Sequence, residues 1–459
     1  MKWNSALVAS SVVLALSVSG CGAQQEPAHE KSAWDRGFYW GTATAGYQVE
    51  GDAPDSNWRR YVDRTAGKPV TPGSDLLGAG PVDPYKQADD FRHRYKEDIA
   101  NAHAMGVNTF RLGVEWARVM PEPGKWDEKE LAYYDDVVAT LIGSGMTPMI
   151  TLMHFTYPGW VADRGGFMNN VAAFDEFATA ITKRYAGQGV LWVSVNEPVA
   201  FGALEVQTGG IKPDQFGTFL DRVADAHRAV YRAAHAADPK AKVTTNEAYI
   251  SPDVLAQFAG LGKGVEGSFF DRITDSIDYV GFDYYTGTAE DNPVSAQSMA
   301  ARWNTKLQPE DIYYVARYYA QRYPGLPIYV VENGMVTDNG KPRADGVTRS
   351  QYLSDTVFWL QRAKADGIPI IGYNYWSLVD NYEWGSYRPR FGLYSVDALG
   401  DPTLKRVPTD AVATYTQITR DGGTAPGYRL VLPAAHCSTT VGRDSCAPLD
   451  PNGPRAELR

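Results

Sequence analysis

Short apolar segments alternate with longer amphipathic stretches from Phe38 onward, and this alternation limits the possible folds most strongly. Eight segments have the length and the β-branched or aromatic content of buried strands. They are Phe38–Gly41, Thr109–Val114, Pro148–Met153, Leu191–Val195, Lys242–Asn246, Tyr279–Asp283, Pro327–Val331 and Pro369–Tyr375. The gaps between them are too long for hairpins but can hold helical crossovers. The sequence therefore predicts an α/β fold, a single (β/α)8 TIM barrel, over an open doubly wound sheet.

Amphipathic stretches between these segments have the spacing of helices that cover a sheet. The clearest ones span residues 86–105, 128–142, 171–185, 216–237 and 351–365. Most of them stop at a glycine, the residue that commonly ends a helix. The loop after the first segment, Gly41-Thr-Ala-Thr-Ala-Gly46, lacks the glycine pattern of dinucleotide-binding folds, which disfavours that alternative.

The composition fits one soluble globular domain with short additions at both ends. The chain has 459 residues, of which 44% are hydrophobic and 21% are charged, within the usual globular range. Its net charge of −10 argues against nucleic acid as a partner, since phosphate requires a basic surface. We expect a signal segment over residues 1–20, a polar tether over 21–36, the barrel over 37–420 and an extension over 421–459.

The first segment has the composition of an export signal. Lys2 precedes an apolar stretch from Ala6 to Val18 that is too short to span a membrane. The stretch ends in Val18-Ser-Gly-Cys21, which resembles a bacterial lipoprotein signal. That resemblance implies cleavage before Cys21 and lipidation of its thiol, which would hold the protein on a membrane surface, at the cell surface or in the periplasm. An ordinary secretory signal is the alternative.

Two further cysteines lie in the expected C-terminal extension. Cys437 and Cys446 stand in a polar, turn-rich stretch. Because export leads to an oxidising compartment, we expect a disulfide bond between them, with two free thiols as the alternative. A zinc site is less favoured, because only His436 is close enough in sequence to complete the ligand set.

Two glutamates stand where two of the expected strands end. Glu197 lies in Trp192-Val-Ser-Val-Asn-Glu-Pro198, and Glu332 lies in Ile328-Tyr-Val-Val-Glu-Asn-Gly334. The carboxyl ends of barrel strands converge on one mouth, where barrel enzymes build their active sites. Two carboxyl groups that face each other are the minimum equipment for cleaving a glycosidic bond. Each glutamate could instead start a helix or form a structural ion pair.

Five segments, in order along the chain, resemble the signatures of family-one glycoside hydrolases, the β-glucosidase-type barrels. They are Phe38–Gly51, Thr147–His154, Asn196–Pro198, Val331–Gly334 and Tyr375–Trp384. The resemblance extends from about residue 38 to about residue 418, and five segments in order are far more specific than any one of them. It implies a retaining β-glycosidase that hydrolyses β-D-glucosides, with β-galactosides and β-fucosides as further substrates to consider.

The resemblance also implies a role for each matched residue. Glu332 would be the nucleophile, and Glu197 would be the acid and then the base, in a double displacement through a covalent glycosyl–enzyme intermediate. Arg111 and Tyr285 would support the nucleophile. The residues expected to bind the sugar are Gln48, His154, Asn196, Trp376, Glu383 and Trp384. No metal or organic cofactor is implied, because two carboxyl groups suffice for this reaction.

Glu383 also bears on the charge of the substrate. The family includes enzymes for 6-phosphorylated sugars, which would need cations where Glu383 and Trp384 stand. A carboxylate at this position would repel phosphate, so we expect a non-phosphorylated glycone. An exported enzyme would also rarely meet phosphosugars made inside the cell.

Three features depart from the family pattern. Asp283 stands where asparagine is more frequent, Phe155 stands where tryptophan is common, and the stretch 249–278 is shorter than usual. The short stretch leaves the aglycone preference open, and a wider cleft would suit a bulky or lipid-like aglycone such as that of a glycolipid. Two other functions also remain open: transfer of the sugar to an acceptor other than water, and sugar binding without catalysis.

Overall fold

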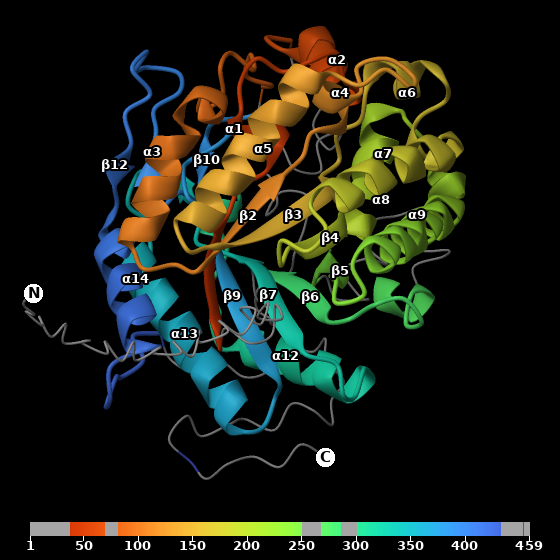
Figure 1. Cartoon of the computed structure of the whole chain (residues 1–459). Helices are drawn as coiled ribbons and strands as arrows, with labels where there is room; N and C mark the ends of the chain where they lie inside the picture. The colour runs from red at the N-terminus through yellow and green to blue at the C-terminus, as the bar shows by residue number, and fades with distance from the viewer. Residues whose placement is uncertain (1–36, 69–80, 250–267, 286–300, 433–452, 454–459) are drawn as a thin grey trace, which may run out of the picture. The chain divides into compact units, whose positions relative to one another are not determined.

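Eight parallel strands close into a barrel in the computed structural model of this chain (Figure 1). The structure describes residues 37–68, 81–249, 268–285, 301–432 and 453. Each strand pairs with the next one along the chain, and the last pairs with the first. The expected (β/α)8 barrel is therefore confirmed. The strands are β1 (Tyr39–Ala43), β2 (Thr109–Gly113), β3 (Thr147–Met153), β4 (Leu191–Asn196), β5 (Lys242–Ala248), β6 (Val280–Tyr284), β7 (Ile328–Asn333) and β9 (Ile370–Trp376).

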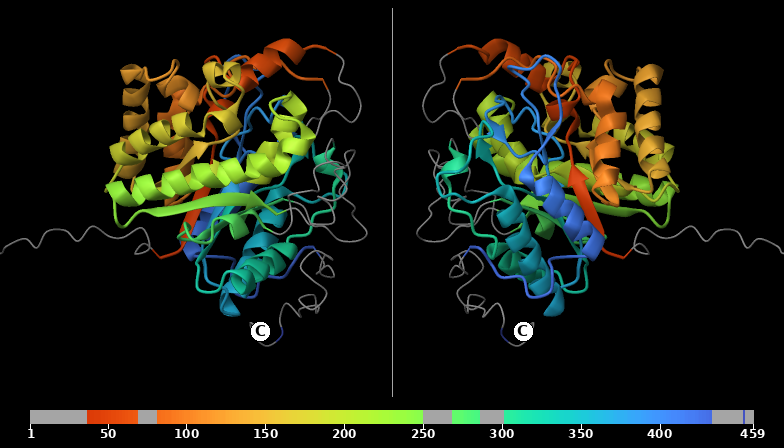
Figure 2. Two further views of the ribbon diagram at one scale, coloured as in Figure 1. Left: turned by 90° about the vertical axis from the view of Figure 1, so that its right-hand side faces the viewer. Right: turned by 90° about the vertical axis from the view of Figure 1, so that its left-hand side faces the viewer.

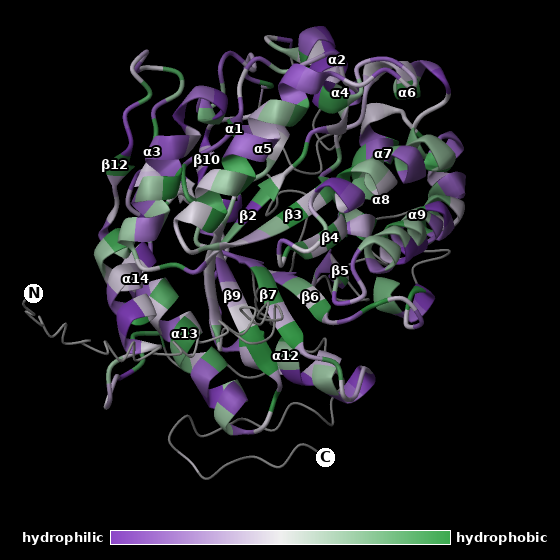
Figure 3. Cartoon of the chain, in the orientation of Figure 1, coloured by the Kyte–Doolittle hydropathy of each residue, from purple (hydrophilic) through white to green (hydrophobic). Residues whose placement is uncertain are grey.

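Helices surround the strands, as the two side views in Figure 2 show. The longer helices are α3 (Phe91–Ala104), α5 (Glu128–Gly143), α7 (Val171–Arg184), α9 (Phe216–Ala237), α12 (Asp311–Arg322), α13 (Arg349–Ala365) and α14 (Asp410–Asp421). The shorter ones are α1 (Gly46–Val49), α2 (Asn57–Thr65), α4 (Trp116–Val119), α6 (Gly159–Asp163) and α8 (Pro198–Thr208). Hydrophobic and hydrophilic residues alternate along helices such as α9 in Figure 3, as expected where one side faces the barrel.

Local sequence explains where several of these helices begin. The Asp127 side chain accepts hydrogen bonds from the backbone amides of Lys129 and Glu130 at the start of α5. Thr348 and Gln351 form a capping box at the start of α13. Such contacts satisfy backbone donors that have no partner within the helix. In helix α12, all of the first six residues and Tyr319 are buried.

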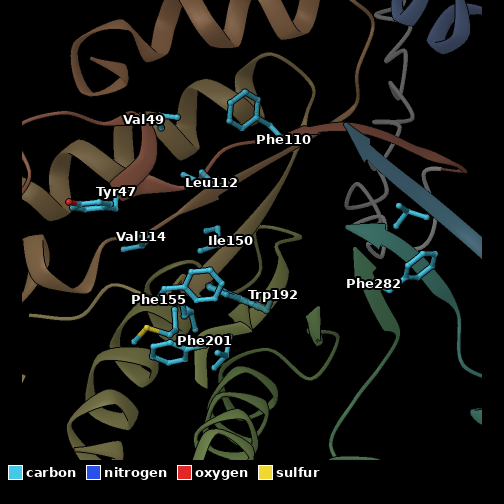
Figure 4. Packing of buried hydrophobic residues seen from close by; sticks show 14 of the residues in the cluster. Tyr47, Val49, Phe110, Leu112, Val114, Ile150, Phe155, Trp192, Phe201 and Phe282 are labelled. Carbon is cyan, nitrogen blue, oxygen red and sulfur yellow. The ribbon is translucent and has the colours of Figure 1, made fainter. Parts of the chain in front are cut away.

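Two layers of apolar side chains hold the barrel together. The outer layer lies between the strands and the helices, and Figure 4 shows part of it. An inner layer fills the barrel itself near the amino-terminal ends of the strands. It consists of Tyr39, Met149, Leu191, Val193, Tyr279, Tyr329 and Val331, all of which are fully buried. This packed inner layer leaves the carboxyl ends of the strands as the place where an opening can form.

Backbone irregularities interrupt β4 and β7 near their carboxyl ends. In β7, Val331 belongs to the inner layer, and the next residue, Glu332, also faces the interior, where it contacts Arg111. Asn333 faces outward and donates a hydrogen bond to Tyr352 Oη on α13 at 3.0 Å. In β4, Ser194 bonds His227 on α9 at 2.7 Å, and the following valine is also on the outer side. Regular strands alternate their faces, so each irregularity changes the face to which the next residue points.

Two small sheets and a C-terminal segment lie beside the barrel. The sheets pair β8 (Thr337–Asp338) with β10 (Pro389–Arg390) and β11 (Tyr394–Ser395) with β12 (Val407–Pro408). After α14, the chain returns to α13, where the buried Asp355 accepts hydrogen bonds from Tyr428 Oη at 2.8 Å and from the amide of Leu432 at 2.7 Å. The first part of the expected extension is therefore attached to the barrel.

Several expected features lie outside the described residues. These are the signal and tether segments, Cys21, Cys437 and Cys446. Among the helices that the structure describes, none combines the length and the apolar character needed to cross a membrane.

Candidate active site

Three carboxyl groups meet at the carboxyl ends of β4, β6 and β7. One oxygen from each of Glu197, Asp283 and Glu332 lies within 4.8 Å of the other two. Retaining glycosidases hold their two carboxyl groups about 5–5.5 Å apart, whereas inverting enzymes need about 6.5–9.5 Å to admit a water molecule. The spacing between Glu197 and Glu332 is therefore that of a retaining site.

Glu332 is held by two donors, one on each of its carboxylate oxygens. The Arg111 guanidinium forms an ion pair with Glu332 Oε1, and Tyr285 Oη donates a hydrogen bond to Oε2. Arg111 is fully buried, and it also donates to Asn196 Oδ1 at 2.6 Å and to Thr151 Oγ1 at 2.9 Å. These contacts fix the carboxylate in place while the two donors compensate its charge.

Glu197, in contrast, lies in an environment that favours its neutral form. It follows β4 with a backbone φ of +38° and immediately precedes Pro198, the first residue of α8. Burial raises the pKa of Glu197 to about 8, and the nearby charge of Glu332 adds to the effect. Glu197 is thus protonated at neutral pH. One carboxyl group of the pair can attack while the other donates a proton.

Asn246, at the end of β5, connects the two sides of this cluster. Its amide nitrogen donates to Asn196 Oδ1 at 2.7 Å and also to Asp283 Oδ2. Asp283 is only 1% exposed. Burial raises its pKa well above the ordinary value, and the charges of Glu332 and Glu197 raise it further.

Five expected sugar-binding residues lie on helix α1, on strand ends and on loops around this cluster. Trp376 Nε1 donates to Glu383 Oε1 at 3.0 Å, and Gln48 Nε2 donates to Asn381 Oδ1 at 3.0 Å. The His154 ring lies 6.0 Å from the Trp376 ring and 5.7 Å from the Trp384 ring, nearly parallel to both. These contacts bring Gln48, His154, Trp376, Glu383 and Trp384 into one wall.

This wall keeps polar atoms available for a ligand. Gln48 Oε1 and His154 Nδ1 are buried, and neither has a hydrogen-bond partner. Leaving such atoms unsatisfied costs about 1–3 kcal/mol each, so a bound hydroxyl group would be favoured at both. Burial lowers the pKa of His154 well below its ordinary value, and Arg111 lowers it further, so the ring is neutral and can both donate and accept. Burial raises the pKa of Glu383 to about 7.

Three residues in these contacts were not anticipated from the sequence. Asn246 bridges Asn196 and Asp283, Thr151 accepts from Arg111, and Asn381 orients Gln48. Asn246 could have been found, because it is a polar residue that closes an expected strand, like the two glutamates. Thr151 gives no such signal, since a threonine inside a strand is ordinary.

The three carboxyl groups are a poor fit for a resident metal ion. Arg111 already places a full positive charge against Glu332, and Tyr285 uses its second oxygen. A cation would have to displace or approach the guanidinium, which Coulomb repulsion opposes. The donor arrangement therefore suits acid–base and nucleophilic chemistry by the side chains themselves.

Comparisons with known proteins agree with this geometry. The sequence matches "Glycosyl hydrolase family 1" over residues 30–259 and 275–424. It is 28% identical to beta-glucosidase A of Thermotoga maritima, with 84% of this chain and 98% of that protein covered. It is 26% identical to the aryl-phospho-beta-D-glucosidase BglA of Bacillus subtilis, with 84% of this chain and 98% of that protein covered.

The fold also matches solved structures. A structure of beta-glucosidase from Thermotoga maritima in complex with deoxynojirimycin superimposes with a TM-score of 0.69 and 25% identity, covering 85% of this chain and 99% of that one. The sequence match covers most of the chain, and the barrel carries the paired carboxyl groups at the expected strand ends. The chain therefore belongs to glycosyl hydrolase family 1 and is a glycosidase.

Proposed function

We propose that this enzyme is a retaining β-glycosidase that hydrolyses non-phosphorylated β-D-glucosides, with β-galactosides and β-fucosides as secondary substrates. The observation that carries the proposal is the short distance between Glu197 and Glu332 together with their opposite environments. The related beta-glucosidase A of Thermotoga maritima supports the choice of glucosides.

The first step uses both carboxyl groups at once. Glu332 attacks the anomeric carbon while Glu197 gives its proton to the departing glycosidic oxygen. The carbon–oxygen bond to the aglycone breaks as the ester bond to Glu332 forms. Asn196, held by Arg111 and Asn246, is placed to bond the sugar 2-hydroxyl, a contact that strengthens in the transition state.

The second step reverses the roles. Esterification removes the charge of Glu332, which lowers the proton affinity of Glu197. Glu197 then accepts a proton from water as the water oxygen bonds to the anomeric carbon. The ester bond breaks, and both glutamates return to their starting states.

The charge of the glycone does not follow from the relatives, because one of them is an aryl-phospho-β-glucosidase. Glu383 supports an uncharged glycone, since it is only 4% exposed and bonds Trp376. One cation, Arg302, acts on Glu383 and lowers its pKa, against the larger effect of burial. Equal kcat/KM on glucosides and 6-phosphoglucosides would contradict this proposal, and Arg302→Gln would show whether Arg302 carries the phosphate activity.

A mechanism-based label gives the main test. We expect a 4-nitrophenyl β-D-glucoside to be hydrolysed, and a 2-fluoro-glucoside to inactivate the enzyme by esterifying Glu332. Peptide mapping should locate the label there. A label on another residue would refute the double displacement, and sugar binding without hydrolysis would support the non-catalytic alternative. Product analysis with added alcohols separates hydrolysis from transfer to another acceptor.

Sequence features near the two ends of the chain lead us to propose where the enzyme is located. Val18-Ser-Gly-Cys21 supports a lipid anchor on Cys21, and export supports a Cys437–Cys446 disulfide in a membrane-attached enzyme. Cys21→Ser should move the enzyme from the membrane fraction to the soluble fraction. The mass of the mature protein, before and after reduction and alkylation, should report both the lipid and the disulfide.

Activity on glycolipids in vesicles, compared between anchored and Cys21→Ser enzyme, tests the glycolipid substrate.

A further inference from the structure

The residue after His154 has an unusual backbone conformation. Phe155 has a φ of +65°, which a residue with a bulky side chain adopts only under constraint. Its ring lies in the outer apolar layer, 5.8 Å from the Phe201 ring (Figure 4). Within the described residues, His154 Nδ1 has no hydrogen-bond partner. The position of the His154 ring therefore depends on its two tryptophan neighbours and on the backbone that follows it.

The side chain of Asn57, the first residue of α2, bridges this stretch of backbone. Asn57 Nδ2 donates to the carbonyl of Phe155 at 2.9 Å, and Asn57 Oδ1 accepts from the amide of Tyr157 at 2.9 Å. The backbone amide of Asn57 also donates to the carbonyl of Tyr157 at 3.1 Å. One partly buried side chain thus satisfies backbone groups on both sides of Thr156 and supports the left-handed conformation at Phe155.

The residues on either side of Asn57 attach α2 to the same region. Ser56 and Pro158 form an antiparallel bridge. The Trp58 ring packs against the Trp384 ring, with 4.8 Å between the centroids. The start of α2 therefore supports two residues of the sugar-binding wall, Trp384 through ring packing and His154 through the backbone.

We propose that Asn57 is a positioning residue, which holds the backbone after β3 so that the His154 ring can bond a hydroxyl group of the glycone. This inference rests on the proposed function. Without the Asn57 side chain, two backbone groups lose their partner and the left-handed conformation at Phe155 loses a restraint. The His154 ring is then held less firmly, and its contact with the sugar weakens. Asn57 acts through His154 and does not touch the sugar in this role.

The test is a double-mutant cycle in kcat/KM on a 4-nitrophenyl β-D-glucoside, with the wild type, Asn57→Ala, His154→Ala and the double variant. We expect Asn57→Ala to lower kcat/KM by about ten-fold or more in the wild type. In the His154→Ala background, the same substitution should lower it by less than about two-fold, because the contact that Asn57 supports is already gone. A merely structural role would lower kcat/KM by the same factor in both backgrounds.

Asn170, just before α7 in the same crossover, provides a matched control. Its Nδ2 donates to the carbonyls of Arg164 at 3.1 Å and of Gly166 at 2.7 Å, so it also bridges backbone groups. Asn170→Ala should lower the free energy of unfolding but leave kcat/KM within about two-fold in both backgrounds. If Asn57→Ala fails to fold, Asn57→Ser takes its place in the cycle, since a serine hydroxyl can still bond one of the two backbone groups.

A binding measurement makes the same comparison without turnover. Deoxynojirimycin is an imino sugar with the hydroxyl groups of glucose, and isothermal titration calorimetry gives its Kd for the four proteins of the cycle. We expect Asn57→Ala to raise this Kd about ten-fold in the wild type and less than about two-fold in the His154→Ala background. Equal factors in the two backgrounds, in either measurement, would overturn the inference. A wild type that shows this coupling in binding but cleaves no glycoside would instead overturn the proposed function.

Discussion

The two ends of the barrel interior differ sharply although the same strands build both. At the amino-terminal end, the inner layer of seven residues, which includes Leu191 and Tyr329, packs without charged groups. At the carboxyl end, Arg111 and three carboxyl groups share a buried space. Apolar packing supplies stability at one end, and the other end keeps costly buried charges that serve the reaction. The contrast indicates that stability and activity are separable here by substitution.

The largest expected effect is loss of the nucleophile. Glu332→Gln should lower kcat/KM by at least about 10⁴-fold, because the amide cannot form the ester with the sugar. Glu247→Gln is a matched control, since Glu247 is a buried glutamate at the end of β5 that bonds Ser268 Oγ at 2.5 Å. Steady-state kinetics should show near wild-type activity per folded molecule for the control. Comparable losses in both variants would break the proposed separation.

A cavity at the amino-terminal end should have the converse effect. Leu191→Ala removes a fully buried side chain from the inner layer and should lower the free energy of unfolding by about 2–5 kcal/mol. Its kcat/KM, measured well below the unfolding temperature, should stay within about two-fold of the wild type if the ends are independent. Urea denaturation and kinetics on the same preparation test both parts, and a large fall in activity without unfolding would show that the ends are coupled.

Two adjacent tyrosines sharpen the comparison. Tyr285 donates to Glu332, whereas Tyr284 faces outward and donates to the carbonyl of Gln308. Tyr285→Phe removes a bond to a charged group, worth about 1.5–3 kcal/mol, and should lower kcat/KM roughly 10–100-fold. Tyr284→Phe should reduce stability but not kcat/KM. The prediction fails if the two variants lose activity equally.

The smallest effect concerns a carboxyl group buried outside the cluster. Glu205 on α8 accepts from Tyr157 Oη at 3.1 Å, and burial raises its pKa from 4.5 to about 7. The folded state binds this proton more tightly than the unfolded chain, so its contribution to stability is present at low pH and is lost as the pH rises toward about 7. Glu205→Gln should reduce the fall in stability between about pH 5 and pH 7, by about 1.4 kcal/mol per pH unit at most. Parallel stability curves from urea denaturation at several pH values would contradict this.

Much of this architecture could be predicted from the sequence. The eight expected strands are present in order, and so are the five expected helices. Helix α9 has the expected bounds, whereas the other four have shifted ends, such as α3, which begins at Phe91 and not at Lys86. The helices show the period of one buried face, and the strands appear as short apolar stretches because both of their faces are buried. Helix α12 was not among the expected helices, although its residues are amphipathic.

The candidate site was predictable in its members but not in its geometry. Glu197, Glu332, Arg111 and Tyr285 were expected together, and contacts or electrostatic coupling link them in the structure. Asp283 was visible only as a departure from a family pattern, because nothing in its flanking residues indicates that three carboxyl groups would converge. The inward direction of Glu332 was not predictable, since Ile328 to Val331 is apolar throughout and shows no alternation.

The irregularities in β4 and β7 matter for the design of a new enzyme that would carry these catalytic residues on another barrel. Copying only the glutamates and their neighbours onto a regular eight-stranded scaffold would send the nucleophile toward the surrounding helices, since parity along the chain decides its direction. A successful graft must carry the misaligned stretch of backbone as well. The catalytic machinery thus includes the irregular strand pairing itself. Deleting one residue from β7 would inactivate the enzyme even if every catalytic residue were kept in the sequence.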